Sequence, residues 1–118
     1  MQYLLLIYQS EAESKPPSEA AGKAIYAEYG KLTQDIKESG NYKGGNALQP
    51  IATATTVRKR DGKILATDGP FAETREQLGG YYLIDAAHLD DAIAIAARIP
   101  AARSGSIEVR PIWSVPAA

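Results

Sequence analysis

Two short stretches of the chain, residues 2–8 (QYLLLIY) and 80–86 (GYYLIDA), carry apolar residues on both of their alternating sets of positions. A strand that packs on one side only alternates apolar with polar residues. We therefore predict that these stretches are central strands covered on both faces.

Two other stretches have the periodicity of helices. In residues 18–39 Ser18 is a typical N-cap, Gly40 is a typical C-terminal stop, and apolar residues recur every three or four positions. These apolar residues are Ala21, Ile25, Tyr29, Leu32 and Ile36. A second helix is expected between His88 and Pro100, with a buried stripe of Leu89, Ala92, Ile93 and Ala96. We expect His88 to cap this helix or to lie on the surface.

A hairpin is predicted from residues 51–60 and 63–67, because Asp61-Gly62 between them suits a type I′ turn. Its threonine-bearing sides favour the edge of the sheet. Residues 41–50 are expected to form a loop or a short irregular strand. Residues 106–113 are expected to form the last strand, which lies at an edge or frays at Pro111, because proline has no N–H to donate.

The order of these elements predicts an α+β fold of the ferredoxin-like kind, a βαββ(β)αβ sandwich with an antiparallel sheet and one extra short strand. Residues 1–118 are expected to form a single domain. Helices cover one face of such a sheet, and no segment is left over for the other. We therefore expect a homodimer, in which two sheets pack face to face as a dimeric α+β barrel.

The composition excludes several kinds of functional site. The chain has no cysteine and one histidine, which excludes disulfides and cysteine nucleophiles and argues against zinc. We expect no metal site and no cofactor. Thirteen basic and fourteen acidic residues give a net charge of −1, so direct binding to nucleic acid is not expected. The basic run at residues 58–63 suits a solvated hairpin better than a phosphate-binding patch.

Residues 1–8 are apolar but too short to cross a bilayer, and they lack the features of a signal peptide. We therefore expect a cytoplasmic protein that does not contact the membrane.

Ionisable residues, glycines and a proline gather in residues 67–81. Asp68-Gly69-Pro70 predicts a sharp turn, which the Asp68 side chain either ties together or leaves for chemistry. Residues 72–78 predict a short helix with Glu73 and Glu76 on one side. Phe71 either joins the core or closes the base of a pocket.

In a cleft these side chains would supply an acid–base pair and an anchor for an anion. Asp68 and Glu73 are the candidate catalytic residues. The candidate substrate-binding residues are Arg75, Glu76, Arg110, Tyr81 and Phe71. Tyr3, Tyr8, Tyr81 and Tyr82 either line the same cavity from the sheet or pack at the dimer interface.

The segment DGPFAETREQLGGYYLI resembles the signature of the DGPF branch of the YCII-related family, and matches in residues 1–5, 89–92, 97–100 and 105–112 support the resemblance. It implies a ferredoxin-like dimeric α+β barrel. The broader family is suspected of catalysis through a histidine–aspartate pair in the barrel cleft, and Asp68 would be that aspartate. His88 falls at the start of a helix and is no obvious partner.

Two functions remain open. The first is an enzyme that binds a small, anionic molecule, with Asp68 as general acid or base. The second is a non-enzymatic accessory protein, because members of this branch are similar to proteins encoded beside extracytoplasmic-function sigma factors.

Overall fold

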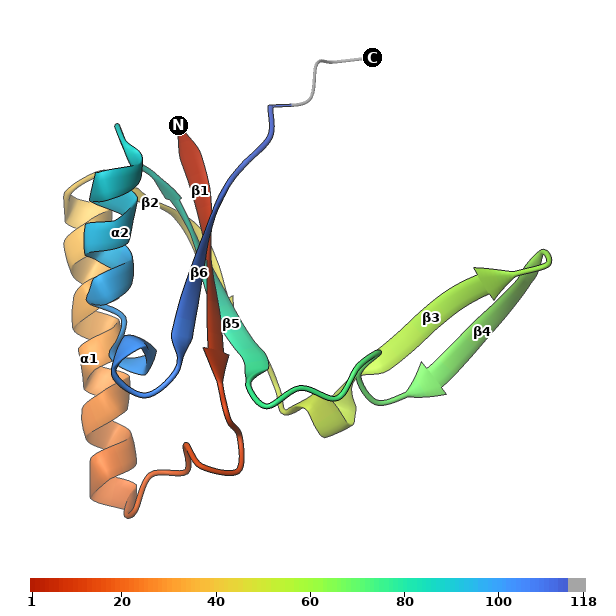
Figure 1. Cartoon of the computed structure of the whole chain (residues 1–118). Helices are drawn as coiled ribbons and strands as arrows, with labels where there is room; N and C mark the ends of the chain where they lie inside the picture. Colours follow the sequence, from red (N-terminus) through yellow and green to blue (C-terminus); the bar gives the residue numbers. More distant parts are fainter. Residues whose placement is uncertain (115–118) are drawn as a thin grey trace.

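The computed structural model describes residues 1–114 (Figure 1). Its helices are α1 (Glu19–Glu38) and α2 (Leu89–Ala97), with short 3₁₀ turns at Ile51–Thr53 and Pro100–Arg103. Its strands are β1 (Gln2–Gln9), β2 (Tyr42–Ala47), β3 (Thr55–Arg60), β4 (Lys63–Asp68), β5 (Gln77–Asp85) and β6 (Ser106–Pro111).

The main sheet has the strand order β2-β5-β1-β6, and its pairs are antiparallel. Both helices lie on one face of it (Figure 1). This arrangement confirms the predicted ferredoxin-like α+β fold. The two apolar stretches became the two central strands, β1 and β5.

The edge strand beside β5 is β2, which the sequence left as loop or irregular strand. A glycine in each of the two strands allows the backbones of β2 and β5 to come close together. A Cβ on Gly45 would lie 2.9 Å from the carbonyl oxygen of Tyr81, and a Cβ on Gly80 would lie 2.9 Å from that of Asn46. The backbones of β2 and β5 therefore meet where a larger residue would have to push them apart.

The predicted hairpin forms, but its predicted place at the sheet edge is wrong. Strands β3 and β4 pair only with each other and project from the body as a separate two-stranded sheet, residues 55–68, which we call the arm (Figure 1). The turn is type I′ as expected, with φ of 50° at Asp61 and 76° at Gly62. The edge position it was expected to fill is held by β2.

The ends of α1 are set by local chemistry, as predicted. The Ser18 hydroxyl accepts a hydrogen bond from the backbone N–H of Ala21 at 3.0 Å. At the other end Gly40 has φ of 83°, and the N–H groups of Gly40 and Asn41 bond back to Lys37 and Ile36. His88 is exposed before α2, and its side chain makes no capping hydrogen bond.

The core lies between the main sheet and the helices. Its largest fully buried side chains are Leu5, Ile36, Ile84 and Ile99. Leu5 is paired with Tyr82 on one side and Val109 on the other, so one face of three strands enters the core. Within residues 1–114, no helix is both long and apolar enough to cross a bilayer.

The opposite face of the sheet has no cover within the described chain. We call it the open face. Its half-buried apolar residues are Leu4, Leu6, Tyr8, Tyr81 and Leu83. We predicted that both faces of the central strands are covered, and a single chain covers only one of them.

Candidate functional site

The connection between β4 and β5 is where the sequence placed the chemistry. The helix predicted over residues 72–78 is wrong, because this segment is irregular and β5 begins at Gln77. The Thr74 hydroxyl donates to the Glu76 carbonyl at 2.6 Å, and the Gln77 amide donates to the Thr74 carbonyl at 2.6 Å. Such side-chain bonds to nearby backbone compete with helical hydrogen bonds.

Further hydrogen bonds join this connection to two other loops. The side-chain oxygen of Gln77 accepts from the backbone N–H of Glu11 at 2.9 Å. The hydroxyl of Ser106 donates to the Glu76 carboxylate at 2.8 Å. The end of β1 and the starts of β5 and β6 are thereby held together at one end of the main sheet.

A polar pocket of about 280 Å³ opens at this end of the main sheet, and we call it the loop pocket. Its lining residues are Ser10, Glu13, Ser14, Arg75, Glu76 and Ser104. The structure thus brings together two of the predicted site residues, Arg75 and Glu76. They stand beside three hydroxyl groups that the sequence analysis did not single out.

Arg75 gives the loop pocket its chemistry. Among residues 1–114 no carboxylate lies within ion-pair distance of its guanidinium. A guanidinium offers several N–H donors in a plane, which suits a carboxylate or phosphate. Glu76 and Glu13 add carboxylates that can accept or return a proton. The pocket can therefore hold an anion next to an acid–base group.

Asp68, Phe71 and Glu73 lie outside the lining of the loop pocket. Asp68 ends β4 and is exposed, and its carboxylate makes no ion pair within residues 1–114. The Phe71 ring is 79% exposed, so within one chain it neither joins the core nor closes the loop pocket.

The turn after Asp68 is closed by other groups. The N–H of Gly69 donates to the Ala54 carbonyl at 2.7 Å, and the Thr56 hydroxyl donates to the Gly69 carbonyl at 2.8 Å. Gly69 has φ of 94°, which glycine adopts without strain. The Asp68 carboxylate is therefore not what ties the turn together.

The candidates on the main sheet divide between its two faces. Arg110 pairs with Leu4 and is exposed on the open face, where Tyr81 also lies and accepts a hydrogen bond from Asn46 at 2.9 Å. Tyr3 and Tyr82 point to the helices instead and are buried in the core, so both expectations for them, the cavity and the dimer interface, are wrong. Strand alternation sends neighbours such as Tyr81 and Tyr82 to opposite faces.

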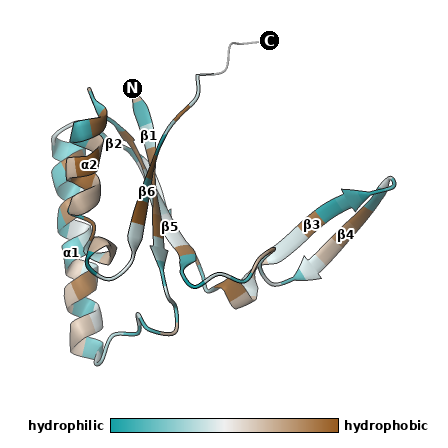
Figure 2. Ribbon diagram, viewed as in Figure 1, coloured by the Kyte–Doolittle hydropathy of each residue, from teal (hydrophilic) through white to brown (hydrophobic). Residues whose placement is uncertain are grey.

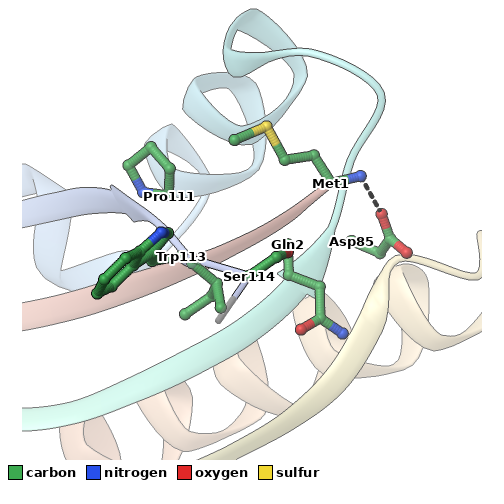
Figure 3. A pocket seen from close by; sticks show the side chains of 7 residues that line it. Met1, Gln2, Asp85, Pro111, Trp113 and Ser114 are labelled. Carbon is green, nitrogen blue, oxygen red and sulfur yellow. Dashed lines mark hydrogen bonds and ion pairs between the residues drawn. The ribbon is translucent and has the colours of Figure 1, made fainter. Parts of the chain in front are cut away.

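A larger pocket of about 590 Å³ lies at the other end of the main sheet (Figure 3). Its lining residues are Met1, Gln2, Asp85, Pro111, Ile112, Trp113 and Ser114. The ammonium group of Met1 lies 2.9 Å from Asp85, and this hydrogen bond holds the pKa of the Asp85 carboxyl below its ordinary value. The sequence analysis assigned no role to these residues.

The missed loop-pocket residues had a signal in the sequence. Ser10 directly follows the first strand, and Ser104 precedes the last one. Because neighbouring antiparallel strands run in opposite directions, the end of β1 lies beside the starts of β5 and β6. A search for polar residues at these matched strand ends would have found Ser10 and Ser104, whereas Glu13 and Ser14 lie further along the connection after β1. The described chain holds no cluster of three or more histidine, cysteine or acidic residues suited to a metal.

Comparisons with known proteins agree with this fold. The family model described as YCII-related domain matches residues 1–116. An uncharacterized protein of Rhizobium meliloti (strain 1021) is 36% identical over 114 residues, covering 95% of this chain and 92% of its own.

A solved structure is also similar, with a TM-score of 0.51 and 14% identity, over 97% of this chain and 94% of its own. It is 5-chloro-2-hydroxyhydroquinone dehydrochlorinase from Burkholderia phenoliruptrix AC1100, in complex with 2,5-dihydroxybenzoquinone. At this identity the likeness shows a shared fold.

Proposed function

The chain belongs to the YCII-related domain family, and on that premise we propose that it binds a small anionic molecule in the loop pocket. We further propose that it works as a homodimer of the DGPF branch, with two open faces packed together as a dimeric α+β barrel, and that residues 1–118 are one domain.

The observation that carries the binding proposal is Arg75, a cation without a carboxylate partner among residues 1–114, in a pocket with three serine hydroxyls. Glu13 and Glu76 also line the pocket, but neither forms an ion pair with Arg75, so the guanidinium N–H groups remain available to an anion. Arg75 directly follows Thr74, whose hydrogen bond to the Glu76 carbonyl fixes the local backbone. The backbone that carries Arg75 is therefore fixed before a ligand arrives, which lowers the entropic cost of binding.

The open face carries the homodimer proposal. It presents a contiguous apolar centre of Leu4, Leu6 and Leu83 from the two central strands, with Arg110 and Asp85 nearer its margins. An apolar sheet face of this kind is stable only when another layer covers it. A second copy supplies that layer with the same residues about a two-fold axis.

Proton transfer is the chemistry that these side chains support. Glu76 is one of two carboxylates in the loop pocket, the other being Glu13; it is held by Ser106 and is next to Arg75 in sequence. Asp68, the aspartate that the family resemblance favours, and Glu73 stand outside it in one chain. We assign Glu76 the contact with the ligand, and Asp68 and Glu73 the supporting acid–base role once the dimer and ligand surround them.

Calorimetric titration tests the binding proposal. The similar dehydrochlorinase is seen with 2,5-dihydroxybenzoquinone, an acidic hydroxyquinone, so this compound, benzoate and inorganic phosphate are suitable probes. We expect at least one to bind, and Arg75→Gln to weaken that binding by about 10- to 100-fold, the worth of a charge-assisted hydrogen bond.

The matched control is Arg58→Gln on the arm, which removes the same charge away from the pocket and should leave the dissociation constant unchanged. The proposal fails if none of the three probes binds, or if Arg75→Gln binds as tightly as the unaltered chain. It also fails if both variants weaken binding equally, because the effect would then be one of net charge.

The second candidate is an accessory role beside an extracytoplasmic-function sigma factor. The exposed apolar side chains outside the open face favour it, since such surface often binds another protein. Phe71 at the base of the arm and Leu89 and Ile93 on α2 are examples. Under this candidate none of the probes binds, whereas under the first the loss follows Arg75.

A further inference from the structure

The arm has two chemically different faces. Cross-strand partners in a hairpin point to the same side, and successive residues alternate. The partners Val57 and Ala66, Lys59 and Ile64, and Thr55 and Asp68 therefore share one face, which we call the apolar face. The other face, which we call the basic face, carries Thr56, Arg58, Arg60, Lys63, Leu65 and Thr67.

The apolar face has nothing against it in the described chain. Ile64 is 74% exposed and Val57 is 63% exposed. Figure 2 shows hydrophobic residues on both strands of the arm, which stands away from the body. A two-stranded hairpin with both sides in water is marginally stable at best. One side carries Val57, Ile64 and Ala66, with Lys59 and Asp68 among them, and the other side carries three cations. An antiparallel sheet with one largely apolar side usually packs that side against another layer.

We propose that the arm clasps a second copy of this chain, with its apolar face packed on the body of the partner copy. This inference rests on the proposed homodimer and adds a second contact region to it. It assigns a function to the hairpin, which the fold and the loop pocket do not use.

The shape of the chain supports this occupant. The arm leaves the main sheet on the side opposite the helices, so it and the open face form two sides of an angle (Figure 1). The radius of gyration is 16.5 Å, whereas a compact chain of this length has roughly 13–14 Å. A copy that packs on the open face occupies this angle and lies beside the arm.

Charge also favours a second copy. Residues 55–68 hold four of the thirteen basic and two of the fourteen acidic side chains, a net charge of +2. The remaining residues therefore hold nine basic and twelve acidic side chains, a net charge of −3. The net charges steer a basic arm towards an acidic body as two copies approach, while the basic face itself points away from the contact. In a symmetric dimer each arm meets the body of the other copy.

The clasp gives Asp68 a new setting. Asp68 shares the apolar face with Val57 and Ile64, at the end of the arm nearest its own body. When that face packs on the partner copy, the Asp68 carboxylate is carried to the boundary between the subunits. Its exposure in a single chain is then a consequence of the missing partner.

Adjacent residues of β4 provide a matched test. Ile64→Asp places a carboxylate on the apolar face, and Leu65→Asp places the same group on the basic face. Sedimentation equilibrium should show that Ile64→Asp raises the dimer dissociation constant by about 100-fold, because a buried unpaired charge in each of two equivalent contacts opposes association. Leu65→Asp should change it by less than about threefold.

Cysteine labelling gives a second measurement with milder changes. The chain has no cysteine, so Ile64→Cys and Leu65→Cys each introduce a single thiol. In the dimer the thiol at position 64 should react with a maleimide about tenfold more slowly than the thiol at position 65, because its face is covered. Dilution to the monomer should remove the difference.

The outcomes separate the clasp from the homodimer. If the unaltered chain is a monomer at millimolar concentration, the homodimer and the clasp both fail. If it is a dimer that Leu6→Asp dissociates, while Ile64→Asp does not and the two thiols react equally, the open-face dimer stands and the clasp is wrong. A Leu65→Asp effect as large as that of Ile64→Asp also overturns the clasp.

Discussion

The body and the arm are built from similar β patterns and end in opposite environments. In the body, Leu5 on β1 is 0% exposed beneath the helices. In the arm, Ile64 occupies the apolar side of its strand equally regularly and is largely exposed. Periodicity states which residues share a face, and the rest of the fold determines whether that face is covered.

The difference also concerns what holds each region together. The body has a core shared by the main sheet and both helices, and surface contacts such as the ion pair from Arg98 to Asp35 at 2.6 Å support it. The arm has a hairpin ladder and a well-formed turn, but no core of its own. Its order should therefore depend on a partner, whereas that of the body should not.

The largest expected effect comes from shortening one side chain in each region. Leu5→Ala should lower the free energy of unfolding by about 2–5 kcal/mol, because it opens a cavity in the core. Ile64→Ala should matter only where the chain is dimeric, and its effect should disappear on dilution. Urea unfolding at two widely spaced protein concentrations measures both.

An Ile64→Ala loss that persists unchanged in the monomer would contradict this distinction. The arm would then be part of the same cooperative unit as the body.

Substitution of one glycine in each region should have a smaller effect on stability and gives a second comparison of the body with the arm. A Cβ on Gly105 would collide with the carbonyl oxygen of Tyr8 in the body. Gly105→Ala should therefore cost about 1–3 kcal/mol. Gly62 lies in the arm turn with φ of 76° and open space around it. Gly62→Ala strains the turn locally, and global unfolding of the monomer should be unchanged.

Denaturant midpoints measure the Gly105 effect, and amide exchange of residues 55–68 measures loosening of the arm. Equal shifts of the global midpoint in both variants would show that the two regions unfold as one.

The smallest expected effect is a pH dependence confined to the body. The hydrogen bond from Lys31, with a further one from Arg98, lowers the pKa of Asp35 below its ordinary value of 3.8. The folded state therefore releases this proton more readily than the unfolded state. The resulting stabilisation is present above the ordinary pKa and is lost as the pH falls through the lowered one.

Urea unfolding between pH 6 and about pH 2.5 measures this dependence, and Asp35→Asn should make the curve shallower. A variant curve as steep as that of the unaltered chain would assign the acid sensitivity to other carboxyl groups.

Local signals predicted most of the fold. The Ser18 cap, the Gly40 stop and the Asp61-Gly62 turn all form where they were expected, because each depends on chemistry within a few residues. The position of the hairpin was wrong, since it depends on contacts distant in sequence. At the sheet edge, β2 takes the place beside β5, and a Cβ on its Gly45 would lie 2.9 Å from the carbonyl oxygen of Tyr81.

The site was predicted in part. Residues 67–81 contain Arg75 and Glu76, which do meet in one pocket, but the expected short helix is absent. Hydrogen bonds from Thr74 and Gln77 replace it. Ser10 and Ser104 join the pocket through strand pairing, a relation that composition and spacing do not carry.

The sequence by itself determined the two faces of each strand, the Asp61-Gly62 turn, the ends of α1 and the lack of cysteine chemistry, because these follow from backbone preferences and from alternation. The buried stripe predicted for α2 was half wrong, since Leu89 and Ile93 are each 49% exposed and Ile95 is buried instead. Only the tertiary structure decided which faces are covered. It packed one side of the main sheet beneath two helices, left the open face and the apolar face of the arm exposed, and assembled the loop pocket from three connections. Burial is a property of neighbours that are far apart in the chain, and a local pattern cannot specify them.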